Sequence, residues 1–341
     1  MARAGARMIA NPLKGNIRMV ICADRRVEML MTNGSLIYAN PYVLSSDNAG
    51  VNSPASTFRP PSEHYENFPV ASWLCPPGLR APIAAIYWFA RTADDIADEG
   101  IDSAEQRLAT LGAYRDDLER VRRGQSPGPH WPDVFGPLAP MITRFDLPTT
   151  LLGNLLDAFE QDVRYSAATR RYQTDAELHD YCRLSANPVG RLLLHLYGIH
   201  DTASLARSDQ ICSALQLINF WQDVGRDIAH GRWYPSVERM TQHGVTDADL
   251  LRDQPHAAAS RMLASYAADA RAMMRQGAPL ARQISGRAGW ELRLVVQGGL
   301  RILDKMAAMD HQTWRTRPRL SKLDIPLMLW RALVPATGAV R

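Results

Sequence analysis

Four aspartates in two separated segments have the residue type and spacing of metal-binding carboxylates. Asp94 and Asp98 are four residues apart in a strongly helix-forming stretch, so both side chains lie on one helical face. Asp223 and Asp227 repeat this spacing. Carboxylates this close repel one another unless a basic side chain or a divalent cation compensates their charge. The spacing therefore indicates a site that receives positive charge.

Each pair of aspartates continues a longer polar stripe along its helix. The stripes are Tyr87, Arg91, Asp94 and Asp98, with Asp95 and Glu99 beside them, and Gln216, Asn219, Asp223 and Asp227. A solvated acidic helix end is the alternative for the first stripe, but the helix dipole disfavours acids there. The second stripe is surrounded by bulky apolar residues, and buried amides and carboxylates need partners. We therefore expect it to line a cavity.

Two such helices that face each other would form a specific kind of chemical centre. Hard carboxylate oxygens suit Mg²⁺, which shares its remaining positions with water and phosphate oxygens. This arrangement holds a diphosphate and neutralises the charge that develops as it departs. Arg91 would add a fixed positive charge. The chemistry favoured is ionisation of a diphosphate ester, which leaves a carbocation.

A carbocation requires an apolar chamber with aromatic faces around it. The candidate aromatic residues are Phe68, Trp73, Tyr87, Tyr181, Phe220 and Trp221. For each of them, ordinary core packing is the favoured explanation, and a position facing the cation is the alternative.

The elements that must position these residues are helices. Apolar residues recur three and four apart in 80–98, 103–122, 148–165, 174–196, 203–229, 257–276, 288–310 and 321–333. Gly100, the stretch from Gly124 to Pro132, Gly198, Gly231 and Gly277 separate the segments. The expected fold is all-α: one domain of antiparallel helices around a central active-site cavity.

Charge and composition narrow the possible classes of protein. The chain has 341 residues and a net charge of +4, and the first 60 residues account for the whole excess. A basic nucleic-acid-binding face is therefore not indicated. Four cysteines, Cys22, Cys75, Cys182 and Cys212, show no zinc-ligand spacing and are expected to be reduced thiols. No stretch is apolar for long enough to span a membrane.

The domain organisation follows from the same patterns. Residues 1–62 are predicted to be a disordered extension or to lie upstream of the true start, with a short hairpin around Asn33-Gly34 as an alternative. Residues 63–335 form the helical domain, and 336–341 form a C-terminal tail.

At these motifs the sequence resembles the squalene and phytoene synthase family, from about residue 64 to 335. The resemblance implies the isoprenoid synthase fold, with Asp94, Asp98, Asp223 and Asp227 as ligands of Mg²⁺ and the substrate diphosphate. It implies catalytic roles for Tyr87, Arg91, Tyr181 and Asn219. It implies substrate-binding roles for His64, Phe68, Gln216, Gln222 and Arg319, the last in a basic segment from Arg317 to Lys322.

Within the family, the segments His64–Ser72, Arg91–Gly100, Leu184–Gly190 and Asn219–Asp223 are similar to the bacterial hydroxysqualene synthases. This resemblance implies presqualene diphosphate as substrate and water as the group that quenches the cation, within hopanoid biosynthesis. Arg226, between the second pair of aspartates, departs from the pattern and could pair with a carboxylate.

Two alternatives remain open at this stage. The first is a condensing squalene or phytoene synthase that acts on farnesyl or geranylgeranyl diphosphate. The second is a non-catalytic helical assembly protein on the same fold, which would be expected to have lost the carboxylates. The expected partners are an upstream presqualene diphosphate synthase and a downstream squalene-forming oxidoreductase. The expected location is the cytoplasm, with peripheral contact at the inner face of the membrane.

Overall fold

The computed structural model describes residues 17–21, 27–32, 35–38, 75–98 and 101–334. The chain divides into two compact units, Met1–Ser72 and Trp73–Arg341. The first contains three short antiparallel strands in the order β1 (Ile17–Ile21), β2 (Val27–Thr32) and β3 (Ser35–Tyr38). Thr32 pairs with Ser35, so β2 and β3 flank the Asn33-Gly34 step at which a hairpin was considered. The assignment of residues 1–62 as a disordered or upstream extension stays a prediction.

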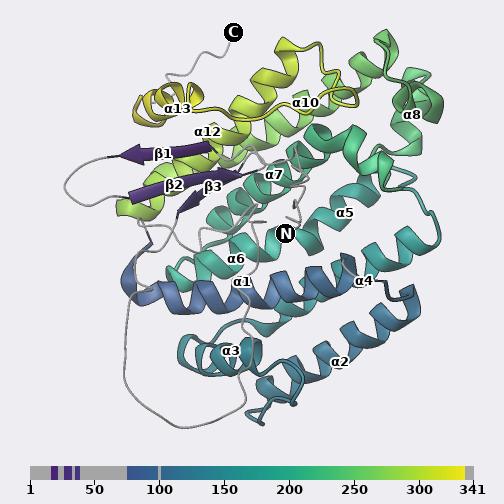
Figure 1. Cartoon of the computed structure of the whole chain (residues 1–341). Coiled ribbons are helices and arrows are strands. Elements are labelled where there is room, and N and C mark those ends of the chain that lie inside the picture. Colours follow the sequence, from purple (N-terminus) through teal and green to yellow (C-terminus); the bar gives the residue numbers. More distant parts are fainter. Residues whose placement is uncertain (1–16, 22–26, 33–34, 39–74, 99–100, 335–341) are drawn as a thin grey trace, which may run out of the picture. The chain divides into compact units, whose positions relative to one another are not determined.

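In the described residues of the second unit, all regular secondary structure is helical (Figure 1). Its helices are α1 (Pro77–Asp98), α2 (Ala104–Arg122), α3 (Pro132–Phe145), α4 (Thr149–Ala167), α5 (Asp175–Ser185), α6 (Asn187–Leu196), α7 (Thr202–Ala229), α8 (Val237–His243), α9 (Asp247–Leu251), α10 (Ala257–Gly277), α11 (Leu280–Gln283), α12 (Gly286–Ala308) and α13 (Asp324–Leu333). The expectation of an all-α fold for this part of the chain is confirmed.

Several helices differ from the sequence-based expectation, and proline explains the largest difference. Helix α3 was not anticipated, because Pro132 was interpreted as part of a break. Proline is instead favoured in the first helical turn, where its missing N–H has no partner to lose. The expected helix 174–196 divides at Ala186 into α5 and α6, with Pro188 in the first turn of α6. The short helices α8, α9 and α11 were also missed.

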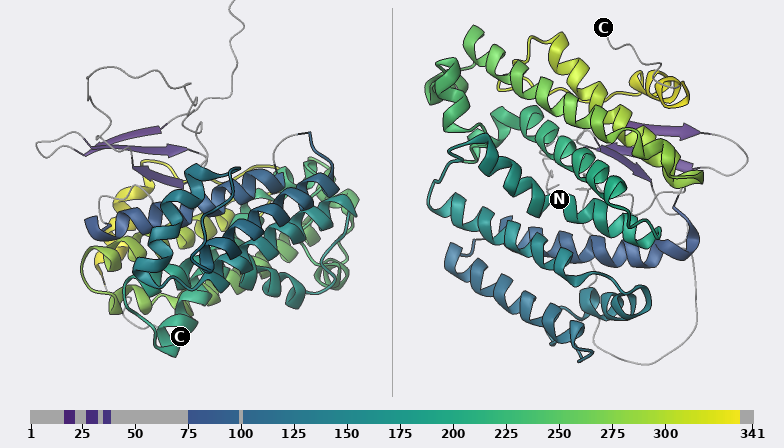
Figure 2. Two further views of the ribbon diagram at one scale, coloured as in Figure 1. Left: turned by 90° about the horizontal axis from the view of Figure 1, so that it is seen from below. Right: turned by 180° about the vertical axis from the view of Figure 1, so that it is seen from behind.

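Helix α7 runs through the middle of the helical unit. It packs against α10 and α12 on one side and against α5 and α6 on the other, as the view from behind in Figure 2 shows. Trp221 is fully buried and stacks on Tyr266 of α10, with ring centroids 3.9 Å apart. Trp221 therefore belongs to the packed core, in agreement with the core-packing interpretation favoured for it.

The cysteine and membrane expectations can be compared with the described residues. Cys75, Cys182 and Cys212 are free thiols, as predicted, and Cys22 lies outside the described residues. None of the helices in the described part of the chain is both long enough and apolar enough to cross a membrane.

Candidate active site

The first pair of aspartates lies in the last two turns of α1, beside an arginine of the same helix. Arg91 donates to the Oδ2 atom of Asp94 at 2.8 Å, and its other terminal nitrogen lies 2.5 Å from Asp95. The i, i+3 and i, i+4 spacing of these residues makes both contacts possible on one helical face. The side chains of Asp94 and Asp95 are each 37% exposed, so this acidic group remains accessible.

The second pair lies on α7, within residues 216–228, where most side chains are buried. Apart from Gly225 and the exposed Arg226, the residues of this stretch that are not buried are those of the polar stripe. Gln216, Asn219, Asp223 and Asp227 are all partly accessible, while their apolar neighbours are buried. The expected polar stripe on a buried helix is therefore present. Arg226 is exposed and acts on Asp227 only through its charge, which lowers the pKa of that carboxyl slightly against the larger raising effects.

Arg232 connects the two acidic helices electrostatically. Its guanidinium donates to Asp98 at a distance of 2.9 Å, and its positive charge also acts on Asp94 and Asp227. One guanidinium group therefore interacts with members of both aspartate pairs, on α1 and on α7.

The end of α7 explains how Arg232 reaches this position. Gly231 has φ +79°, in the left-handed region that terminates helices. The backbone N–H of Gly231 donates to Ile228, and that of Arg232 donates to the carbonyl of Asp227. This pair of bonds reverses the chain directly after the helix. Gly231 was predicted only to separate two helices, and Arg232 was not predicted as a site residue.

Three carboxyls in this region have strongly raised pKa values. Burial raises the pKa of Asp94 to about 7, with further contributions from Asp98 and Asp95. Burial also raises the pKa of Asp227 to about 7, assisted by Asp223. The pKa of Asp162 on α4 is raised to about 7 in the same way, and the charges of Asp98 and Asp94 act on it. Burial is thus the main cause of all three shifts, and neighbouring carboxylates add to it.

The C-terminal segment after α12 is attached to α7 at three neighbouring positions. Arg317 donates to Asp223 through two nitrogens: Nε donates to Oδ1, and Nη2 donates to Oδ2 at 2.9 Å. Gln222 is buried and donates to the backbone carbonyl of Pro318 at 2.7 Å. Gly225 lies directly against the backbone of Trp314, where a Cβ atom would overlap the Trp314 carbonyl.

These contacts change the interpretation of two predicted substrate-binding residues. The side chain of Gln222 is buried and its amide is bound to Pro318, so the structure gives it a structural partner instead of an open position. Within the basic segment, Arg319 is exposed, and it is Arg317 that lies against the aspartates. The predicted basic segment, residues 317–322, does lie beside α7, where Arg317 contacts Asp223. Nothing in the spacing of its basic residues distinguishes Arg317 from Arg319.

An aromatic group adjoins the acidic residues. Tyr181 of α5 donates to Oδ2 of Asp162 at 2.7 Å, and its ring lies 6.1 Å from Phe220 of α7. Phe220 stacks on Tyr234 with centroids 3.6 Å apart, and Tyr172 lies 6.3 Å from Tyr234. The electron-rich faces of such rings can stabilise a cation. Tyr181 and Phe220 were expected here, whereas Tyr172, Tyr234 and Asp162 were missed because no spacing links them.

The remaining predicted residues fall into two groups. Tyr87 is buried on α1 and meets Trp88 edge to face, with centroids 5.2 Å apart. His64, Phe68 and Trp73 lie outside the described residues, so their predicted roles stay predictions.

The donor set of this region suits a hard divalent cation. Its carboxylates come from two helices, and their pKa values are raised first by burial and then by the charge of neighbouring carboxylates. Among the residues described in 75–98 and 101–334, no three His, Cys, Asp or Glu side chains gather closely enough to hold a metal by themselves. Magnesium commonly binds one or two carboxylates and completes its coordination with water and substrate phosphate.

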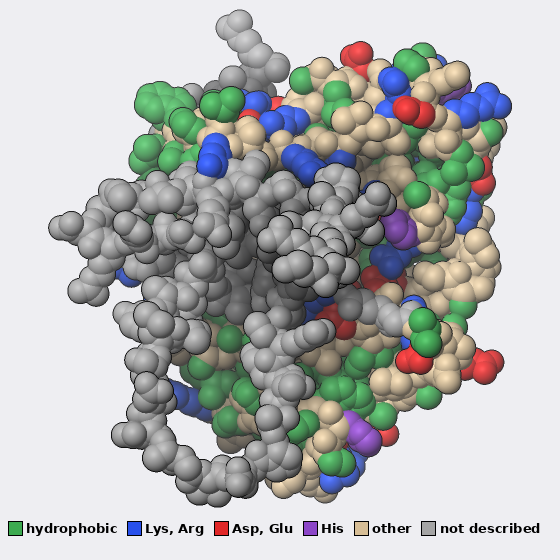
Figure 3. Space-filling model, in the orientation of Figure 1, with side chains coloured by type: hydrophobic (Ala, Val, Ile, Leu, Met, Phe, Trp, Pro, Cys, Tyr) green, Lys and Arg blue, Asp and Glu red, His purple; other side chains and the backbone are tan. Residues whose placement is uncertain are grey.

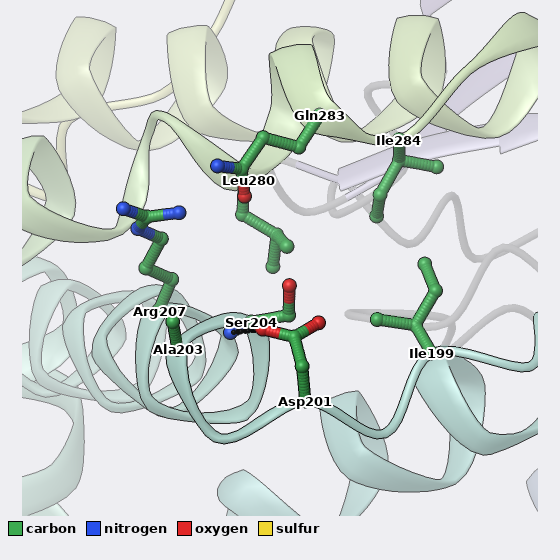
Figure 4. Close-up of a pocket in the computed structure, with 8 residues that line it drawn as sticks. All are labelled: Ile199, Asp201, Ala203, Ser204, Arg207, Leu280, Gln283 and Ile284. Atoms are coloured by element: carbon green, nitrogen blue, oxygen red, sulfur yellow. Dashed lines mark hydrogen bonds between the residues drawn. The ribbon is translucent and has the colours of Figure 1, made fainter.

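A separate pocket of about 350 Å³ lies at the other end of α7 (Figure 4). Its lining includes Asp201, Ser204 and Arg207 near the start of α7, and Leu280 and Gln283 of α11. Arg207 and Asp223 are separated by roughly 24 Å along the helix axis. This pocket contains none of the predicted site residues.

Comparisons with known proteins bear on the whole helical unit. The family model for squalene/phytoene synthase matches residues 62–324. A hydroxysqualene synthase of Sinorhizobium fredii is 32% identical over 265 residues, covering 77% of this chain and 86% of that protein. A phytoene synthase of Thermus thermophilus is 29% identical over 274 residues, covering 80% of this chain and 90% of that protein.

A solved structure agrees with these matches. The crystal structure of a squalene synthase from Alicyclobacillus acidocaldarius is 34% identical with a TM-score of 0.66, over 73% of this chain and 90% of that one. The chain therefore belongs to the squalene/phytoene synthase family, whose members are enzymes of isoprenoid biosynthesis that act on prenyl diphosphates.

Proposed function

We propose that the protein ionises presqualene diphosphate and quenches the rearranged cation with water, giving hydroxysqualene and diphosphate. The observation that carries this proposal is the arrangement of the two aspartate pairs around Arg232, next to the rings of Tyr181 and Phe220. Relatives of similar length that are named hydroxysqualene synthase support the choice of reaction.

The diphosphate end of the substrate would lie at the aspartates. Asp94 and Asp98 on α1 and Asp223 and Asp227 on α7 would hold the proposed cofactor, Mg²⁺. When bound, Mg²⁺ would supply positive charge that stabilises the departing diphosphate. Arg232 offers a further positive charge to the diphosphate, since its guanidinium already lies among these carboxylates.

The hydrocarbon end would lie against the aromatic group. The faces of Phe220, Tyr234 and Tyr181 would stabilise the cation after the carbon–oxygen bond to diphosphate has broken. Quenching forms a carbon–oxygen bond to water and releases one proton. Asp162 is a suitable acceptor, because it is bound to Tyr181 and its pKa is raised to about 7.

The reaction is tested with the purified full chain, presqualene diphosphate and Mg²⁺, without a reductant. The expected result is hydroxysqualene whose oxygen comes from isotopically labelled water, and no product once a chelator is added. Recovery of unreacted presqualene diphosphate, or of a product without the water-derived oxygen, would overturn the proposed reaction.

A condensing synthase that joins two molecules of farnesyl or geranylgeranyl diphosphate is the second candidate. Relatives named phytoene synthase and presqualene diphosphate synthase favour it, at 29% and 32% identity. The same aspartates would serve both reactions, so supplying farnesyl diphosphate alone and, separately, geranylgeranyl diphosphate alone distinguishes the two candidates. Retention of both aspartate pairs argues against a non-catalytic assembly protein.

The proposed reaction also implies neighbours and a location. Its substrate must be supplied by a presqualene diphosphate synthase, and its alcohol must be consumed by an enzyme that reduces it to squalene, which is an oxidoreductase. Both substrate and product are lipids. We therefore place the protein in the cytoplasm, in peripheral contact with the inner face of the membrane, for the synthesis of hopanoids.

A further inference from the structure

Helix α13 has one buried face and one exposed face that is apolar. Asp324, Met328 and Ala332 are buried, and α13 packs on α12. The opposite face carries Leu323, just before the helix, and Trp330, whose positions differ by seven residues and therefore by nearly two full turns. Most of the surface of each is exposed, 88% for Leu323 and 64% for Trp330.

The exposed apolar residues of the described chain are concentrated at this one place. Eight large hydrophobic side chains are exposed among the described residues, and five of them belong to the segment 323–334. These five are Leu323, Leu329, Trp330, Leu333 and Val334. Figure 3 shows hydrophobic side chains gathered over α13, with basic side chains beside them. Scattered exposed apolar residues need no explanation, but a contiguous patch marks an interaction surface.

The charge around this patch identifies the kind of partner. Residues 315–334 contain five basic residues and one acidic residue, Asp324, which is buried and paired with Arg301 and Lys305. Three of the basic residues, Arg315, Arg317 and Arg331, pair with aspartates of other segments, which leaves Arg319 and Lys322. Arg319 and Lys322 are exposed, and within residues 75–98 and 101–334 neither forms an ion pair. Arg282 lies at the other end of the helix and donates to the carbonyl of Val334 at 2.8 Å.

We propose that α13 is a docking helix for an anionic lipid bilayer, with its Trp330 face inserted at the level of the headgroups. Exposed Leu and Trp on one face, with Lys and Arg at the margins, are the features that hold a helix in the plane of a membrane interface. At ten residues, α13 is much too short to span the bilayer. The inference rests on the peripheral location within the proposed function, but not on which reaction the protein catalyses.

The test measures binding of the full chain to vesicles, without substrate. Vesicles of phosphatidylcholine mixed with phosphatidylglycerol are compared with vesicles of phosphatidylcholine alone, by co-sedimentation. We expect binding to the mixed vesicles, weakened about tenfold or more in the double variant Trp330→Ser/Leu333→Ser. Leu251→Ser on α9 is the matched control, because Leu251 is 63% exposed and lies on another helix, and it should change binding by less than about twofold.

A second variant separates the electrostatic contribution. Arg319→Gln/Lys322→Gln should weaken binding to the anionic vesicles about tenfold and remove most of its dependence on salt. The proposal is overturned if the wild-type chain binds neither kind of vesicle, or if Trp330→Ser/Leu333→Ser binds as the wild type does. It is also overturned if Trp330→Ser/Leu333→Ser leaves vesicle binding unchanged but converts a dimer to a monomer in sedimentation velocity. That result would assign the patch to contact with a second copy of the chain. Circular dichroism verifies that each variant is folded. A negative result in the vesicle experiment does not bear on the proposed reaction, which is tested separately with presqualene diphosphate.

Discussion

The two aspartate pairs are compensated in different ways. On α1, the acids lie in the last turns of the helix and receive a charge from Arg91, only three residues before Asp94. On α7, Asp223 is 15% exposed and is bound by Arg317, which lies 94 residues further along the chain. The first pair is thus largely a local arrangement on one helix. The second exists only when the C-terminal segment is folded onto α7.

This difference separates what each pair requires. The α1 pair needs one helix and the turn at Gly231 that presents Arg232. The α7 pair needs correct packing of residues 314–318, since Gln222, Asp223 and Gly225 all contact that segment. Disturbance of the C-terminal segment should therefore affect the α7 pair before the α1 pair.

The largest expected effect comes from removing one carboxylate of either pair. Asp94→Asn and Asp223→Asn should each lower kcat/KM by about two to three orders of magnitude, because each removes a proposed ligand of the metal–diphosphate group. Steady-state kinetics with presqualene diphosphate measures the loss. Asp253→Asn is the control, because Asp253 also pairs with an arginine of the C-terminal segment but is 84% exposed. Unchanged turnover in either site variant would contradict the role of that pair.

The next effect distinguishes the α7 pair from surface ion pairs. Arg317→Gln leaves Asp223 without its main counterion in a site where both side chains are nearly buried, and should destabilise the protein by about 2–4 kcal/mol. Arg315→Gln breaks an exposed pair with Asp253 and should cost about 0–1 kcal/mol. Urea unfolding of the metal-free protein compares the two. Equal losses would show that the α7 pair is no more dependent on its arginine than an exposed pair.

Packing between α7 and the C-terminal segment can be tested at a single glycine. Gly225→Ala places a methyl group against the Trp314 carbonyl and should destabilise by about 1–3 kcal/mol, while lowering activity through displacement of Arg317. Gly112→Ala in α2 meets no atom within 4 Å and should stabilise by about 0.5–1 kcal/mol. Thermal unfolding and kcat/KM provide the measurements. A stable and active Gly225→Ala variant would mean that the segment does not need this close approach.

A further effect concerns pH in the absence of metal. Asp94, Asp162 and Asp227 have folded-state pKa values of about 7, against an ordinary value of 3.8. The folded protein therefore binds more protons than the unfolded chain between these values. Their contribution to stability is fully present below about pH 4 and is lost as the pH rises to about 7. Urea unfolding in the presence of a chelator should accordingly show lower stability at about pH 7.5 than at about pH 5.5.

A matched variant and added metal sharpen this measurement. Asp227→Asn should flatten the pH dependence, because it removes one of the three titrating groups. Added Mg²⁺ should restore stability mainly at the higher pH, where the carboxylates are ionised. A stability that rises steadily over this range would contradict the assigned shifts.

How much of this could be predicted depends on whether the signal is local. The positions of Asp94, Asp98, Asp223 and Asp227 follow from helical periodicity, which also placed seven of the long helices to within a few residues. Arg317 could not be distinguished from Arg319, because the segment that carries them is irregular and only tertiary packing decides which side chain meets Asp223.

Other omissions have separate physical causes. Asp162 belongs to no repeated spacing, and its importance arises from neighbours on α1 and α5 that the sequence leaves far away. Helix α3 was not predicted because Pro132 was included in a break between helices, although it begins the helix.

The attachment of Arg317 to Asp223 has a consequence for the protein during its synthesis. The ribosome completes α7 long before it reaches residue 317, so Asp223 and Asp227 emerge while their principal partner is still untranslated. Until Arg317 is made, Asp223 lacks the guanidinium group that binds it in the folded protein. Proteins fold progressively from the N-terminus during synthesis, so a product truncated before Arg317 should retain most of its helices yet lack the contacts that position the second pair.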